Sequence, residues 1–83
     1  MNRFRRTHEL WNWLPAFRAV AETGRLDEAA KRVGVSRSAI SRTVTLLEER
    51  LGRDLFERVG RGLRLTVAGA DLLEASRDAM RSI

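Results

Sequence analysis

The chain has 83 residues and no cysteine, which limits it to one small core and excludes disulfides and thiolate metal sites. Its net charge of +5 rests on 16 Lys and Arg residues, nearly all arginine, which suits bidentate contacts with phosphate or guanine, although genome base composition explains such a bias equally well. No apolar run approaches the roughly 18 residues that span a bilayer, so we expect a cytoplasmic protein without membrane contacts.

The first predicted helix ends near Gly24, a residue type that readily takes the left-handed conformation of a helix C-terminus. Pro15 is tolerated only in a first turn, so either Asn12 caps a helix that begins at Trp13 or a longer helix is kinked there. The apolar face of this helix carries Trp11, Leu14, Phe17, Val20 and Ala21. We expect its tryptophans to anchor the core or an interface, because base stacking on aromatic residues belongs mainly to single-stranded nucleic acids.

The residues from Leu26 to Gly52 predict two helices joined by a tight turn. The first helix has one apolar edge, formed by Ala29, Ala30 and Val33. Gly34 ends that helix in the left-handed conformation, and the Ser36 hydroxyl caps the start of the second helix. The buried stripe of the second helix is expected to contain Ala39, Ile40, Val44, Leu47 and Leu51. This arrangement is typical of a helix-turn-helix.

The face of the second helix that lies off this stripe is polar or cationic. It carries Arg37, Ser38, Ser41, Arg42 and Thr45. Between Ala29 and Leu47 the chain has basic residues but no acid, and acids return only at Glu48. Short polar side chains and arginine suit a face that approaches base edges and phosphates, whereas a solvated face more often carries Glu and Lys. A small helical pair whose basic face meets only water is the alternative.

After Gly52 the apolar period changes from that of a helix to that of a strand. Two short strands are predicted at Asp54–Val59 and Leu63–Thr66, and the glycines of Gly60–Gly62 allow a tight hairpin between them. Arg61 then projects from the tip beside the second helix, which is typical of a wing that meets the minor groove or the DNA backbone. An ordinary solvated turn is the alternative.

Two further ionisable side chains are left out of the binding site, Arg58 as a structural ion-pair partner and His8 as a solvated residue. Arg58 is expected to pair with Glu48 or Glu49 and is therefore left out of the binding site. His8 lies in a basic N-terminal arm without a nucleophile or metal ligand beside it, and the serines near Arg37 have no positioned base. We therefore expect no enzymatic activity, no cofactor and no metal site.

From its N-cap Thr66 the chain is expected to be helical to its end. The stripe along this helix contains Leu72, Leu73, Ser76, Ala79, Met80 and Ile83. Its heptad-like spacing continues to the last residue, so we favour pairing with a second protomer over packing on the same domain. Residues 1–66 are therefore assigned to a DNA-binding domain and residues 67–83 to a linker and dimerisation helix. The expected dimer contacts are Leu72, Leu73, Ser76, Met80 and Ile83.

Short motifs along the chain together resemble the DNA-binding domain of LysR-type transcriptional regulators. They are F-R-A-V-A-E-T-G from Phe17, E-A-A-K-R-V-G-V-S from Glu28, S-A-I-S-R from Ser38, L-E-E-R-L-G from Leu47, L-F-E-R from Leu55 and L-T-V-A-G from Leu65. The resemblance runs from about Trp11 to Arg77. It implies a mainly α-helical fold, a winged helix-turn-helix with a three-helix core and a two-stranded wing, followed by a linker helix through which two protomers form a homodimer.

By position, the resemblance also implies which residues meet DNA. The recognition helix would read the major groove and the hairpin tip would serve as the wing, which gives the set Ser36, Arg37, Ser38, Ser41, Arg42 and Arg61. The expected function is sequence-specific binding of double-stranded DNA in transcription regulation, as a homodimer on an inverted-repeat operator. Full-length members continue into an effector-binding domain, and this chain ends before it, so a small-molecule effector is expected only for a full-length protein. A winged helix that has lost DNA affinity and only dimerises is the second hypothesis.

Two residues depart from the family pattern. Arg37 stands where glutamine is common, and arginine prefers guanine whereas glutamine suits adenine. Asp27 stands where serine or threonine usually caps the first helix of the motif, and its carboxylate would repel a nearby phosphate. We therefore expect a different half-site preference and no phosphate contact from the Asp27 side chain.

Overall fold

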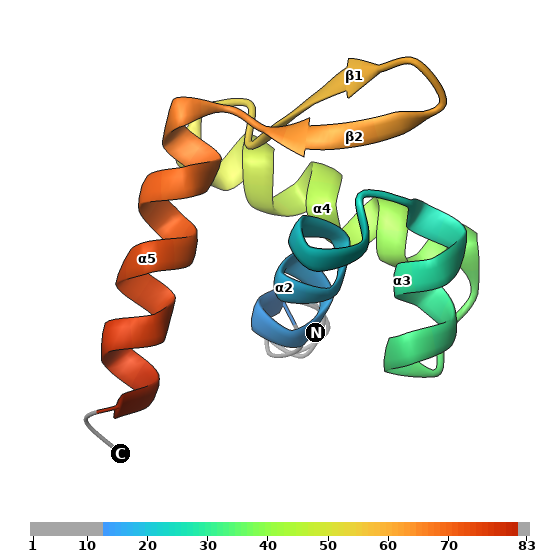
Figure 1. The fold of residues 1–83 in the computed structure, drawn as a ribbon, viewed down its shortest axis with the longest axis horizontal. Coiled ribbons are helices and arrows are strands. Elements are labelled where there is room, and N and C mark those ends of the chain that lie inside the picture. The colour runs from blue at the N-terminus through green and yellow to red at the C-terminus, as the bar shows by residue number, and fades with distance from the viewer. Residues whose placement is uncertain (1–12, 82–83) are drawn as a thin grey trace, which may run out of the picture.

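The computed structural model describes residues 13–81, with side chains described through residue 77. In this range the chain forms helices α2 (Trp13–Thr23), α3 (Leu26–Val33) and α4 (Arg37–Leu51), a hairpin of β1 (Phe56–Val59) and β2 (Gly62–Leu65), and helix α5 (Val67–Arg81). Helices α2, α3 and α4 pack together, the hairpin lies along one side of them, and α5 stands at one end of the molecule (Figure 1). The mainly α-helical, winged helix-turn-helix architecture predicted from the sequence is confirmed.

Aromatic side chains form the centre of the core, where α2 meets the hairpin. Phe17 is fully buried, and the centroid of its ring lies 5.5 Å from that of Phe56 and 6.4 Å from that of Trp13. Trp13 is half-buried against this core, as expected for an anchor, whereas Trp11 and the possible cap Asn12 lie outside the described residues. The other buried apolar side chains are Ala16, Ala19, Val20, Ala29, Ala30, Ile40, Val44, Leu47 and Leu55.

Glycine and serine set the ends of the helices in the helix-turn-helix, as predicted. Gly24 and Gly34 have φ angles of 70° and 82°, and the Gly34 amide donates to the carbonyl oxygen of Ala30. The Ser36 hydroxyl accepts a hydrogen bond of 3.1 Å from the Ala39 amide and so caps α4. A left-handed backbone costs glycine little, so Gly34 can end α3 abruptly. Ser36 then starts α4 two residues later, and the turn between the two helices is short.

Two predictions about these helices are wrong. Asp27 does not cap α3, because the helix begins at Leu26 with Arg25 as its extended N-cap residue, and Asp27 lies in the first turn. The buried stripe of α4 is also narrower than predicted, since Ala39 is exposed and Leu51 is 48% exposed. Successive residues of a helix are turned by about 100°, so Ala39 lies beside the buried face that Ile40 occupies and not on it. Leu51 is exposed because it is the last residue of the helix.

Helix α5 is joined to the domain through Thr66, the predicted N-cap. The Thr66 hydroxyl accepts a hydrogen bond of 3.1 Å from the Gly69 amide and donates one of 2.6 Å to the carbonyl oxygen of Asp54. Gly69 is buried where α5 crosses the segment that enters β1, and a Cβ atom there would lie only 2.2 Å from the carbonyl oxygen of Leu55. Glycine is therefore the residue that allows this close crossing.

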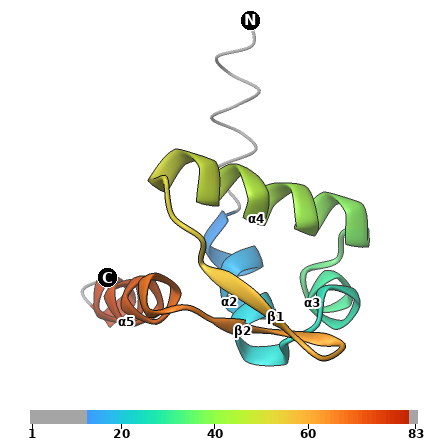
Figure 2. The same cartoon turned by 90° about the horizontal axis from the view of Figure 1, so that it is seen from above.

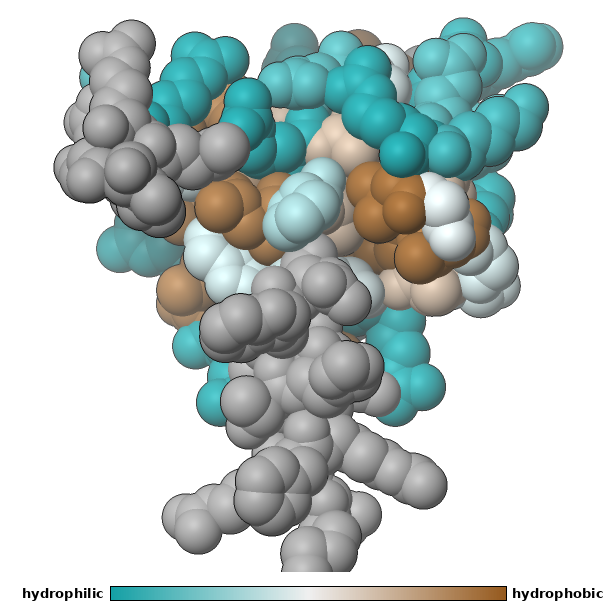
Figure 3. Space-filling view, turned by 90° about the horizontal axis from the view of Figure 1, so that it is seen from below, coloured by the Kyte–Doolittle hydropathy of each residue, from teal (hydrophilic) through white to brown (hydrophobic). Residues whose placement is uncertain are grey.

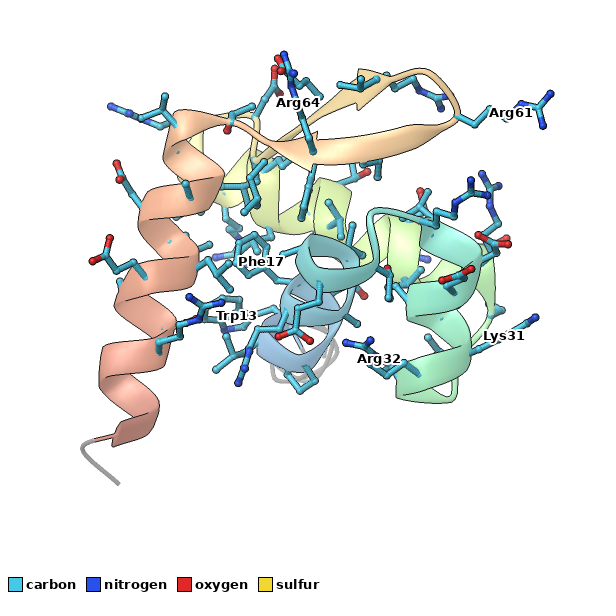
Figure 4. The ribbon with its side chains drawn as sticks, in the orientation of Figure 1. Trp13, Phe17, Lys31, Arg32, Arg61 and Arg64 are labelled. Carbon is cyan, nitrogen blue, oxygen red and sulfur yellow. The ribbon has the colours of Figure 1, made fainter. Side chains whose placement is uncertain are left out.

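The apolar stripe of α5 is covered in part by the chain's own domain, the alternative that the sequence left open, and pairing with a second protomer stays a prediction. Leu72 and Leu73 are half-buried against the core, and Ser76 is only 5% exposed, with its hydroxyl donating to the carbonyl oxygen of Leu73. Helix α5 contacts both α2 and β2, and Trp13 points from α2 toward it (Figure 4). The side chains of Met80 and Ile83 lie outside the described residues.

Candidate nucleic-acid interface

The first turns of α4 present most of the predicted recognition residues at the surface. Arg37, Ser38 and Arg42 are exposed, and Ser41 is half-buried. Ser36 is exposed as well, but its hydroxyl is engaged in capping the helix. Arg37, Ser38 and Arg42 can therefore reach a ligand that approaches the start of this helix. Ser36 sets where the helix begins.

The hairpin places Arg61 at the same end of the molecule. Val59 pairs with Gly62 across the turn, and Gly60 has the positive φ of 58° that such a tight turn requires. Arg61 is exposed and points away from the domain at the tip (Figure 4). Two views at right angles place the hairpin tip and the first turn of α4 at one end of the molecule and α5 at the other (Figure 1, Figure 2). The fold therefore places the two parts of the predicted interface at one end of the molecule, with α3 between them in Figure 2.

Ion pairs within the chain remove some basic residues from this interface. Arg32 lies 2.5 Å from the carboxylate of Glu22, which also pairs with Arg18 at 3.4 Å. Arg64 pairs with Glu57, its partner across the hairpin. Exposed pairs of this kind contribute little to stability, but they lower the local positive charge. Arg18, Arg32 and Arg64 consequently contribute less positive charge to the surface around the predicted site.

The predicted ion pair between Arg58 and Glu48 or Glu49 does not form in the described part of the chain. The Oε2 atom of Glu48 instead accepts hydrogen bonds from the backbone amides of Leu55, at 2.7 Å, and Phe56, at 3.3 Å. The sequence does not predict this role, because an acid near a helix C-terminus is unfavourable with respect to the helix dipole at Glu48 and Glu49 alike. Only the packing of the hairpin against α4 distinguishes the two.

A surface groove of about 680 Å³ runs between the start of α2, the α3–α4 turn and α4. Its apolar lining includes Pro15, Ala16, Val33, Val35, Ala39, Ile40 and Leu46. Ser38 and Arg42 also line it, so two of the predicted recognition residues border apolar surface. The face of the molecule opposite the hairpin exposes such apolar surface between hydrophilic rims (Figure 3).

Within residues 13–81, no helix combines the length and apolar character needed to cross a bilayer. The same part of the chain contains no group of His, Cys, Asp and Glu side chains placed to hold a metal ion.

A capped, cationic helix and a basic hairpin tip on this fold define a winged helix-turn-helix protein. The chain belongs to the bacterial regulatory helix-turn-helix proteins of the lysR family, whose sequence pattern matches residues 11–70. The resemblance found in the sequence motifs is thereby confirmed. Membership of this family identifies the chain as a DNA-binding domain of transcription regulation.

Curated relatives and solved structures share most of this chain. An uncharacterized HTH-type transcriptional regulator of Azotobacter vinelandii is 48% identical over 60 residues, which cover 72% of this chain and 42% of the relative. The HTH-type transcriptional regulator ClcR of Pseudomonas putida is 48% identical over 61 residues, or 74% of this chain and 21% of ClcR. The crystal structure of the CbnR DBD in complex with DNA matches with a TM-score of 0.78 and 44% identity, covering 84% of this chain and 80% of that one. The chain therefore spans well under two thirds of the length of these curated relatives.

Proposed function

We propose that this chain binds double-stranded DNA sequence-specifically in transcription regulation. The observation that carries the proposal is that the first turns of α4, which contain Arg37 and Arg42, lie at the same end of the molecule as the hairpin tip that carries Arg61 (Figure 1, Figure 2, Figure 4). An α-helix fits the major groove, where each base pair presents a distinct pattern, and a basic hairpin tip suits the adjacent minor groove or backbone. In the proposed complex, bases and nearby phosphates are contacted by residues from the first turns of α4, namely Arg37, Ser38, Ser41 and Arg42. Arg61 contacts the DNA backbone. The similarity to CbnR, solved with DNA, supports this assignment.

We further infer that two copies bind an inverted repeat through α5. The chain's own domain covers Ser76, and in the sequence the apolar spacing of this stripe continues beyond it to Met80 and Ile83. Leu72 and Leu73 are only half-buried, so part of their surface is open to a partner. Because α5 lies at the end opposite the hairpin tip, two copies joined through α5 would carry their α4 helices to separate half-sites. Such a regulator would act on DNA in the cytoplasm.

Selection of bound duplexes from a random library, followed by fluorescence anisotropy at several salt concentrations, tests this function. We expect an enriched inverted repeat, and an affinity whose logarithm falls linearly with the logarithm of the salt concentration. A protein that dimerises in sedimentation but binds no duplex at low salt would favour the interaction-module hypothesis instead. Enrichment of a single half-site would support DNA binding and reject the proposed dimer.

A further inference from the structure

We propose that Glu48 is a positioning residue that couples the recognition helix to the wing, an inference that rests on the proposed DNA-binding function. Glu48 is half-buried in the C-terminal part of α4, on the side of the helix that meets the entry to β1. It does not touch DNA in this proposal. Its role is to fix where the hairpin lies relative to the first turns of α4, and so where Arg61 meets the duplex.

One carboxylate oxygen of Glu48 holds two backbone donors. The Leu55 amide donates to it at 2.7 Å and the Phe56 amide at 3.3 Å. Leu55 is 1% exposed and Phe56 is 9% exposed, so water has little access to replace these bonds. Hydrogen bonds to a charged acceptor are stronger than neutral ones, and a buried donor left without a partner is unfavourable. Loss of the carboxylate would therefore leave the start of β1 held to α4 only by apolar packing and the short connection between them.

The hairpin has a second attachment that does not involve the recognition helix. The Leu63 amide of β2 donates at 2.8 Å to the carbonyl oxygen of Gly24, in the loop between α2 and α3. At its base the hairpin is closed by the Thr66 amide, which donates at 3.0 Å to the Leu55 carbonyl oxygen. Without Glu48, these bonds would keep the hairpin folded and attached to the α2–α3 loop, while its position relative to α4 would become less restricted.

This arrangement matters because α4 and the hairpin tip would contact the duplex at different places. Both contacts form together at little entropic cost only when their separation is set before binding. When the hairpin can shift relative to α4, the entropic cost of ordering it on DNA offsets part of the binding free energy that Arg61 contributes. The signature of the proposed role is therefore a dependence of the Arg61 contribution on Glu48, and not a general loss of binding.

A double-mutant cycle on the selected duplex measures that dependence. In the wild-type background we expect Arg61→Ala to weaken binding by about threefold to tenfold, as for loss of one phosphate contact. In the Glu48→Ala background we expect the same substitution to weaken binding by less than about twofold. Glu49→Ala is the matched control, because it removes the same charge from an exposed neighbouring position and should leave the Arg61 effect unchanged. Equal Arg61 effects in the wild-type and Glu48→Ala backgrounds would overturn the proposal.

Glu48→Gln and amide hydrogen exchange keep the test decisive if Glu48→Ala folds poorly. The glutamine oxygen can still accept from the Leu55 amide, so this variant should restore most of the Arg61 effect. Exchange at the Leu55 and Phe56 amides should speed up in the alanine variant, less in the glutamine variant, and not in Glu49→Ala. Unchanged protection of both amides would overturn the coupling. A wild-type chain that binds no duplex would overturn the proposed function and the wing role with it, while the exchange data would still report whether Glu48 holds the hairpin.

Discussion

Gly69 lies in α5 at the point where this helix passes over the segment that enters β1. A Cβ atom there would lie 2.2 Å from the Leu55 carbonyl oxygen and 2.8 Å from a methyl group of Leu65. Glycine to alanine in an open helix position normally stabilises by about 1 kcal/mol, whereas overpacking costs about 1–3 kcal/mol. Because the backbone carbonyl cannot rotate away as a side chain can, we expect Gly69→Ala to lower the free energy of unfolding in urea. Ala70→Gly, at an exposed neighbour, gives the propensity reference, and a gain in stability at Gly69 would contradict the close crossing.

Arg37 is the residue through which this chain is expected to differ from its family in base preference. It is exposed at the first position of α4, where a side chain can reach a base edge. Arginine binds the two acceptors of guanine, and glutamine suits adenine, with about 1–3 kcal/mol of discrimination for a good bidentate contact. We expect Arg37→Gln to change the selected base from guanine to adenine at one position of each half-site, as read by selection from a random library.

A matched control for this substitution is Arg50→Gln, which removes the same charge from an exposed position near the other end of α4. It should weaken binding to all duplexes alike and leave the consensus unchanged. An unchanged consensus with Arg37→Gln would mean that this side chain contacts the backbone only.

Of the three arginines in the hairpin, Arg61 and Arg64 differ in their electrostatic state. Arg61 is exposed at the tip, whereas Arg64 is paired with Glu57 across the strands. We expect Arg61→Ala to lower the slope of log affinity against log salt by about 1, equally on specific and random duplexes. Arg64→Ala should change the slope much less, because its charge is already compensated. Equal slopes for the wild type and Arg61→Ala would show that the hairpin tip does not contact the DNA phosphates.

The elements themselves were largely predictable because their ends depend on residues close together in the sequence. Gly34 and Ser36 act on backbone groups within their own turns, so the turn between α3 and α4 could be read from the sequence. The exposed, cationic face of α4 followed from helical periodicity in the same way. Contacts between distant segments were not predictable. The pairing of Arg32 with Glu22 and the two amides held by Glu48 depend on how the helices and the hairpin pack.

For the whole molecule, the attachment of α5 to its own domain determines how two copies could be arranged. The heptad-like stripe predicted a partner along the whole helix, but its first part packs against the core. Helix α5 is therefore held at a defined angle by its contacts with α2 and β2. In the proposed dimer, that angle sets the separation of the two α4 helices and, with it, the spacing of half-sites on the duplex.

Ser76 provides a test of this link between packing and half-site spacing. It is 5% exposed where α5 meets the domain, so Ser76→Leu must push the helix outward. We expect a loss of about 1–3 kcal/mol in the free energy of unfolding and a changed preference among duplexes whose half-sites are separated by different spacers. Ala75→Leu, at the exposed neighbouring position, should leave both measurements nearly unchanged. If Ser76→Leu destabilises the domain but selects the same spacer as the wild type, the dimer is not arranged through the packing of α5.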